Sequence, residues 1–166
     1  DALLKGIEAW PISSAMRGEL PGSEWLFPIV ETLHVMALSV VVGSIAMMDL
    51  RLLGIAARTS PVSRLSKEVL PWTWTAWCMA AVFGTLMFIS KAHAYATNPQ
   101  FQLKFACMFM AALNMLVFHL GAFRRVEHWD LEDPPTSAKI AGGLSLLFWI
   151  GVVFFGRWVG FTVTTM

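Results

Sequence analysis

The sequence PIVETLHVMALSVVVGSIAMM, residues 28–48, decides the fold class of this chain. A helix rises about 1.5 Å per residue, so about 20 apolar residues cross the hydrocarbon core of a bilayer, and this stretch is long enough to do so. Glu31 and His34 are its only ionisable residues, and their spacing places them on one helix face. Because ionisable groups in membrane helices usually face protein, we expect this face to point into a bundle.

The composition of the whole chain supports a membrane protein. Of its 166 residues, 57% are hydrophobic and only 14% are charged, whereas an average soluble domain has about 25% charged residues. Three further apolar runs follow at residues 74–95, 101–123 and 140–161. We therefore predict an all-α integral membrane protein, a single domain (residues 1–166) built as an up-and-down bundle of four transmembrane helices in the lipid bilayer. The net charge of +1 gives no indication of a nucleic-acid partner.

The N-terminal segment, residues 1–22, is too short and too interrupted to span a membrane. Leu3, Leu4, Ile7 and Trp10 fall on one helical stripe, which predicts a short amphipathic helix at the membrane surface that ends at Pro11. The chain begins with Asp rather than Met, and we expect that a few residues or a cleaved segment precede it.

Lys and Arg residues in the loops predict the orientation in the membrane. Residues 51–70 carry four of them and residues 124–139 carry three, whereas the opposite side has only Lys5 and Arg17 outside the spans. Cytoplasmic loops are enriched in Lys and Arg. We therefore expect both long loops in the cytoplasm and both termini in the periplasm, in the inner (cytoplasmic) membrane of a bacterium.

Several ionisable side chains lie inside the predicted spans. Counting depth at about 1.5 Å per residue groups six of them toward the periplasmic side, and His119 lies alone near the cytoplasmic side. Side chains lean toward the N-terminus of their own helix, so two histidines on neighbouring antiparallel spans converge. The six residues are Glu31, His34, Lys91, His93, Lys104 and Arg157.

Two converging histidines in an apolar bundle predict the axial ligands of a haem b. In this hypothesis His34 and His93 bind the haem iron between the first and second spans. Cations near the same depth, with Arg17 as a further candidate, neutralise the haem propionates. Glu31 either orients His34 or pairs with Lys91, and His119 is a further candidate metal ligand. The three span cations are Lys91, Lys104 and Arg157.

A purely structural interpretation stays open for each of these residues. A membrane histidine often hydrogen-bonds a neighbouring helix, and Lys or Arg near a span end often extends its charge to the interface. Glu31 and His34 also match the Glu-x-x-His spacing of di-iron bundles, but no other span supplies the further carboxylates. Cys78 and Cys107 lie in apolar runs and form no Cys-pair motif, which is typical of small buried side chains.

Two stretches carry a resemblance to a known group: WPISSAMR at residues 10–17 and EWLFPIVETLHVMALSVVVGSIAMMDLRLLG at residues 24–54. They resemble bacterial four-span membrane proteins with no assigned activity, over most of the chain. In layout the chain is more distantly similar to small four-helix b-type cytochromes and to the membrane domains of copper-resistance proteins. That similarity implies haem ligands among the span histidines, here His34 and His93, with His119 as a third candidate. No span carries two histidines, unlike dihaem cytochromes, so it implies at most one haem.

The leading functional prediction is an electron-transfer subunit rather than a stand-alone enzyme. It would pass electrons through the haem between a redox partner on the periplasmic face and quinone or another subunit. One alternative is a structural or accessory subunit of a larger membrane complex, with the polar residues as an internal ion-pair network. Another is a metal-ion or small-solute carrier that uses Glu31 and His34, although carriers usually contain an internal repeat, which this sequence lacks.

Overall fold

The computed structural model describes residues 2–163, and four long helices dominate it. Each is long and apolar enough to cross a membrane, which confirms the predicted all-α architecture with four candidate spans. Large apolar side chains such as Phe109 and Leu147 are 68% and 62% exposed, as expected for surfaces that face lipid. The four helices are α3 (Leu26–Leu52), α4 (Val62–Ser90), α6 (Pro99–Leu120) and α7 (Thr136–Val163).

Short helices fill the connections. The N-terminal segment forms two helices rather than one, because Pro11 begins a second helix instead of only ending the first. Proline suits this position, since its fixed φ fits a first helical turn whose N–H groups have no partner. The predicted polar loop after the third span begins with a 3-10 segment. The short elements are α1 (Ala2–Glu8), α2 (Pro11–Met16), α5 (Ala92–Thr97) and η1 (Ala122–His128).

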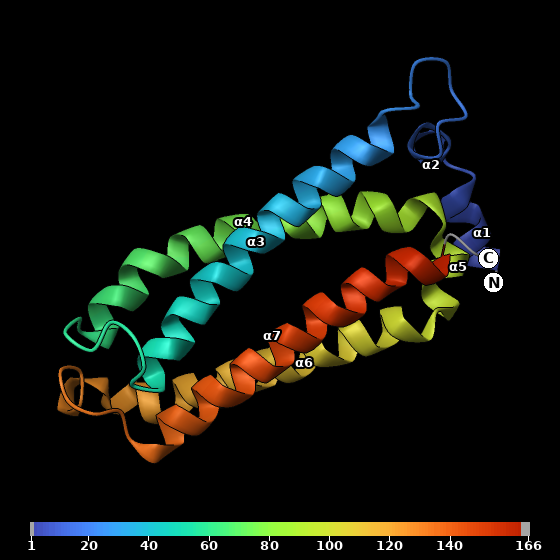
Figure 1. The fold of residues 1–166 in the computed structure, drawn as a ribbon. Coiled ribbons are helices and arrows are strands. Elements are labelled where there is room, and N and C mark those ends of the chain that lie inside the picture. The colour runs from blue at the N-terminus through green and yellow to red at the C-terminus, as the bar shows by residue number, and fades with distance from the viewer. Residues whose placement is uncertain (1, 164–166) are drawn as a thin grey trace.

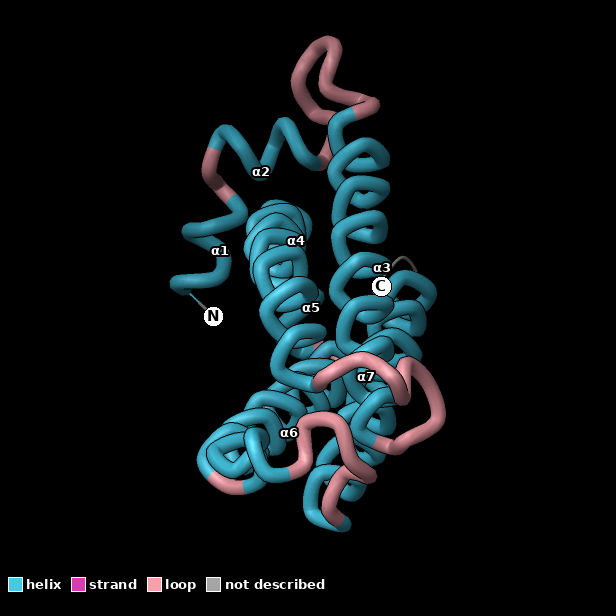
Figure 2. Tube along the Cα trace, turned by 90° about the vertical axis from the view of Figure 1, so that its left-hand side faces the viewer, coloured by secondary structure: helices cyan, strands magenta, loops and turns pink. Residues whose placement is uncertain are grey.

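The four long helices form two antiparallel hairpins, α3 with α4 and α6 with α7 (Figure 1). The hairpins join along α3 and α7, whereas the backbones of α4 and α6 stay further apart, although Phe88 of α4 stacks on Phe101 of α6 with ring centroids 5.6 Å apart. The start of α1 and the end of α7 lie with α2 and α5 at one end of the bundle, called the terminal end below (Figures 1 and 2). The connections at residues 53–61 and 121–135 lie at the other end, called the loop end.

A glycine permits the contact between the hairpins. A Cβ atom on Gly142 of α7 would lie 3.0 Å from the backbone oxygen of Asp49 and 3.1 Å from Cβ of Leu52, both on α3. Only a residue without a side chain allows this approach, which is a common device of membrane helix pairs. The seam between α3 and α7 therefore depends on Gly142.

The helix α4 differs from the predicted second span, residues 74–95, at both ends. It begins at Val62 and ends at Ser90, where Lys91 adopts φ −144° and ψ 56°, outside the helical region. His93 therefore lies on the separate helix α5. Arg17 stabilises this break, because its Nη1 donates hydrogen bonds of 3.0 Å to the carbonyls of both Ser90 and Glu8.

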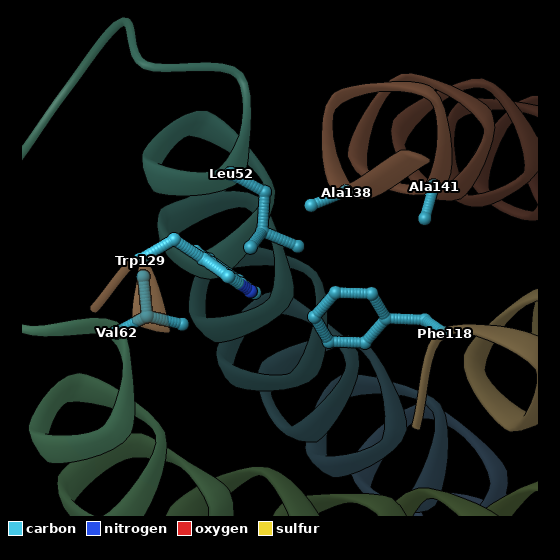
Figure 3. Close-up of a cluster of buried hydrophobic side chains, with 6 residues drawn as sticks. All are labelled: Leu52, Val62, Phe118, Trp129, Ala138 and Ala141. Carbon is cyan, nitrogen blue, oxygen red and sulfur yellow. The ribbon is translucent and has the colours of Figure 1, made fainter. Parts of the chain in front are cut away.

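A hydrophobic cluster closes the loop end. Figure 3 shows Leu52 of α3 and Phe118 of α6 pointing toward each other, with Trp129 beside Val62. Hydrogen bonds join the segment after η1 to the start of α4, since Asp130 accepts from both the backbone N–H and the hydroxyl of Ser63. The cluster consists of Leu52, Val62, Phe118, Trp129, Ala138 and Ala141.

Candidate functional site

His34 lies on the inner side of α3 and binds α4. Its Nδ1 lies 2.8 Å from the carbonyl oxygen of Ala80, and because a carbonyl only accepts, Nδ1 carries the proton. The ring packs on Gly84, where an added Cβ would come within 3.0 Å of Cε1. The Nε2 atom therefore has its lone pair available, the tautomer that metal-ligating histidines adopt when Nδ1–H bonds a carbonyl.

Lys104 of α6 is the cation that the structure brings toward His34. Its side chain packs on Gly156 of α7, where an added Cβ would lie 3.6 Å from Cδ and Cε. Lys104 lies within electrostatic range of His34, and Glu31 lies within the same range of Tyr95 on α5. These four residues, Glu31, His34, Tyr95 and Lys104, form what we call the terminal-end cluster.

The other predicted haem residues lie elsewhere. Lys91 is exposed at the break after α4. Arg157 is exposed on α7, where its guanidinium carbon stands 5.0 Å above the ring of Phe161. The backbone N–H of His93 donates a 2.8 Å hydrogen bond to Oε1 of Glu8 on α1. Depth along the bundle thus grouped these residues correctly with the terminal end, but the helix faces separate Lys91 and Arg157 from the bundle interior.

The structure gives a mixed fit to haem. The protonation of His34 suits an axial ligand, but the ring packs against α4 at Gly84, about two and a half helical turns before His93. A haem between α3 and α4 would require the two helices to separate there. Among residues 2–163, no three His, Cys, Asp or Glu side chains gather as a group able to hold a metal ion. The haem therefore stays a prediction.

A cavity of about 500 Å³ lies between the two hairpins, toward the loop end. Leu52, Phe118 and Ala141 belong both to its lining and to the hydrophobic cluster, which therefore forms its floor. All four long helices contribute side chains. The backbones of α4 and α6 stay apart beside the cavity, so it opens between these two helices, and its rim residues there, Trp74 and Leu116, are 50% and 52% exposed. We call this space the hairpin cavity.

Asp49 is the buried carboxylate of the hairpin cavity. The residue is only 5% exposed, and its Oδ2 has no hydrogen-bond partner within the described chain. The hydroxyl of Ser145 on α7 lies beside the carboxylate. A buried polar atom is nearly always hydrogen-bonded in a folded protein, so an orphaned carboxylate oxygen that lines a cavity points to a partner outside the chain.

Other polar side chains of the hairpin cavity have hydrogen-bond partners within the fold, between two helices for Asn114 and within α6 for His119. Asn114 of α6 donates through Nδ2 to the carbonyl of Ala141 on α7 at 2.9 Å. Nδ1 of His119 lies 2.9 Å from the carbonyl of Met115, and its ring packs edge-on against Phe118 with centroids 5.5 Å apart. His119, predicted as an isolated residue near the loop end, thus lies at the cavity far from the terminal-end cluster.

The sequence contains a signal for an interior position of Asp49. It directly follows the apolar stretch at residues 28–48, and Leu50, Leu52 and Leu53 continue the apolar pattern beyond it. Val41, Ile45 and Leu52 follow the helical period, and Asp49 falls on the same face, which is the face that lines the hairpin cavity.

The fold and these sites define a multi-pass helical membrane protein with polar groups buried in its bundle. The chain belongs to the family of unknown function DUF6644, whose model matches residues 26–162. The match includes all four long helices except the last residue of α7 and leaves out α1 and α2. No curated protein and no solved structure matches the chain.

Proposed function

We propose that this chain binds a small, largely apolar molecule within the membrane, in the hairpin cavity. The observation that carries the proposal is the Oδ2 atom of Asp49, buried without a partner at the wall of a cavity of about 500 Å³. Sites for small molecules are typically concave, mostly apolar and about 300–1,000 Å³ in volume, with a few polar groups that fix orientation. The hairpin cavity has each of these properties.

Entry from the bilayer follows from the arrangement of the helices. The cavity opens between α4 and α6, whose backbones stay apart and whose stacked rings, Phe88 and Phe101, lie at the terminal end, away from the cavity. Tryptophan and leucine side chains at this rim face lipid, so an apolar ligand reaches the cavity from the membrane without crossing water.

A fluorescence experiment tests the proposal. The neutral apolar dye N-phenyl-1-naphthylamine is titrated into lipid nanodiscs that contain the protein, with energy transfer from the cavity tryptophans as the signal. We expect a saturable component with the natural chain that is lost in Ala112→Phe, which fills the cavity from α6. Ala106→Phe is the matched control, because Ala106 is exposed on the same helix and lies outside the cavity lining. Equal binding by all three proteins contradicts the proposal.

A haem b at the terminal-end cluster is a second candidate function, favoured by the hydrogen bond of His34 Nδ1 to Ala80. His34 would bind the iron through Nε2, His93 is the predicted opposite ligand, and Lys104 is the interior cation available to a propionate. Bound haem would supply one-electron chemistry for transfer between a partner on the periplasmic face and quinone or another subunit. The accessory-subunit and carrier alternatives stay predictions.

A visible spectrum of the purified protein tests the haem. We expect a Soret band that is lost in His34→Ala and in His93→Ala but retained in His128→Ala, whose exposed histidine lies at the loop end. The absence of the band, or a band that neither of the first two variants changes, overturns this candidate and leaves the hairpin cavity untouched.

The membrane and the orientation are part of the proposal. Arg58, Arg64 and Lys67 are exposed near the loop end, which supports placing that end in the cytoplasm and both termini in the periplasm of a bacterial inner membrane. Alkaline phosphatase fused after residue 163 should be active, and a fusion within residues 124–135 inactive. The reverse pattern contradicts this orientation.

A further inference from the structure

We infer that the ligand of the hairpin cavity is a lipophilic organic cation, a positively charged group on an apolar body. The inference rests on the proposed function and specifies its ligand class. It follows from the carboxylate of Asp49, from the hydrogen bonds and ion pair that engage two basic side chains at the loop end, and from the tryptophans at the cavity wall.

No basic side chain within residues 2–163 pairs with Asp49. Asp49 and His119 are the only ionisable residues among the described residues that line the hairpin cavity. The neighbouring hydroxyl of Ser145 can donate one hydrogen bond but carries no charge. A buried carboxylate is costly unless it takes up a proton or a cation accompanies it, so a cation is the partner that stabilises the charged form of Asp49.

Two basic side chains at the loop end, Arg51 and Lys139, bind groups other than Asp49. Arg51 is 1% exposed and lies two residues after Asp49, but its Nε donates to the carbonyl of Ser60 at 2.9 Å and its Nη2 to that of Asp130 at 3.1 Å. Lys139 forms a 2.9 Å ion pair with Asp133. Since these two groups hold the loops together, neither of them is available to pair with Asp49.

Aromatic walls suit the same ligand. Trp74 and Trp77 of α4 pack edge to face with ring centroids 5.9 Å apart, and both line the cavity opposite α6. Trp149 of α7 lines it as well. The indole face attracts cations more strongly than any other side-chain ring, and it also packs on apolar groups. A carboxylate with tryptophan rings around a lipid-accessible cavity thus matches a cationic head on an apolar body.

Binding of tetraphenylphosphonium, compared with the neutral triphenylphosphine oxide, tests the inference. Both are titrated against the natural chain in nanodiscs, with quenching of tryptophan fluorescence as the signal. We expect the natural chain to bind the cation at least about tenfold more tightly than the neutral compound, because only the cation gains both the Asp49 charge and the cation–π contacts.

Two variants test whether Asp49 causes the preference for the cation over the neutral compound. Asp49→Asn keeps the shape of the side chain and removes its charge, and we expect it to lose the preference for the cation while it still binds triphenylphosphine oxide. Glu68→Gln is the matched control, since Glu68 is an exposed carboxylate paired with Arg64 on α4, and it should leave the preference unchanged. Retained binding of the neutral compound also shows that Asp49→Asn is folded.

The outcomes separate this inference from the proposed function. Equal affinity of the natural chain for the two compounds, or a preference that Asp49→Asn keeps, overturns the cationic ligand while the cavity remains a binding site. Failure to bind either compound, together with failure to bind the naphthylamine dye, overturns both. The comparison on the natural chain decides the ligand class even if a variant does not fold.

Discussion

The guanidinium of Arg17 donates a 3.0 Å hydrogen bond to the carbonyl of Ser90, which lies 73 residues further along the chain. The carbonyl of Glu8 accepts from the same Nη1 atom, and the Glu8 carboxylate accepts from the backbone of His93. Ser90 is the last residue of α4, where helix carbonyls lack partners within the helix. Arg17 and Glu8 therefore join the N-terminal helices to both sides of the break at Lys91.

Replacing Arg17 by Ala should destabilise the protein. The substitution leaves the carbonyl of Ser90 without its charged donor, and hydrogen bonds to charged groups contribute about 1.5–3 kcal/mol. Thermal unfolding in detergent measures the loss. Arg64→Ala is the control, because it removes only an exposed pair with Glu68 and should change the free energy of unfolding by less than about 0.5 kcal/mol. Equal losses in both variants would show that the link to Ser90 has no special role.

Gly142→Ala should weaken the seam between the hairpins. The new methyl group would lie 3.0 Å from the backbone oxygen of Asp49, so α7 has to move away from α3, at a cost of about 1–3 kcal/mol. Gly43→Ala is the matched control on α3, since nothing lies within 4 Å of its added Cβ, and it should be neutral or stabilising by up to about 1 kcal/mol. Urea titration of the two variants gives both values. A stable Gly142→Ala protein would contradict the close contact at this seam.

Asn114→Leu should destabilise the second hairpin modestly. It removes the 2.9 Å hydrogen bond from α6 to the Ala141 carbonyl on α7, and such bonds between membrane helices contribute about 0.6 kcal/mol on average. Thr75→Val provides the comparison, because the Thr75 hydroxyl bonds only the carbonyl of Pro71 in its own helix. The two variants should separate in thermal unfolding, with Asn114→Leu the less stable. Indistinguishable midpoints would rule out a contribution from the contact between helices.

Asp130, at the loop end, should make the free energy of unfolding depend on pH. Burial raises the pKa of its carboxyl, but hydrogen bonds from the hydroxyl and backbone of Ser63 and the charge of Arg51 outweigh burial and lower it below the ordinary 3.8. A lowered pKa in the folded state means that ionised Asp130 contributes stability above pH 3.8, and the contribution is lost as the pH falls through the lower folded-state value.

The variant Asp130→Asn measures that contribution. Its deficit in the free energy of unfolding should be constant from pH 7 to about pH 5 and should shrink below pH 3.8. Glu132→Gln, an exposed carboxylate in the same loop, should show no such deficit. A deficit that grows on acidification would have the wrong sign and would contradict the role of Ser63.

The architecture could be predicted because the apolar runs are long, but the helix ends could not. α4 starts at Val62, since residues 62–70 continue the helix beyond the apolar run with polar side chains such as Arg64 on the exposed face. Pro71 directly precedes the apolar run at residues 74–95, as a proline does at a helix start, yet it lies inside α4. The break at Lys91 has no local signal, because Arg17 and Glu8, distant in sequence, stabilise it.

For the candidate site, the sequence predicted the depth of each residue along the bundle but not the direction in which its side chain points. Counting residues gives depth, and depth correctly brought His34 and Lys104 to the same end of the bundle. It gives no rotation about the helix axis, which decides that Lys104 faces the interior whereas Arg157 faces outward. Asp49 required the opposite reasoning, since its helix face rather than its depth places it at the hairpin cavity.

The pairing of helices has a consequence for biosynthesis. Each hairpin joins helices that follow one another in the chain, so each pair completes its contacts soon after it leaves the ribosome. The seam joins the first long helix to the last and forms only when α7 has been synthesised. Until then Asp49 on α3 is not covered by α7, which packs against it in the finished fold. Arrival of the fourth span thus completes the fold and shields the one membrane carboxylate of the hairpin cavity in the same step.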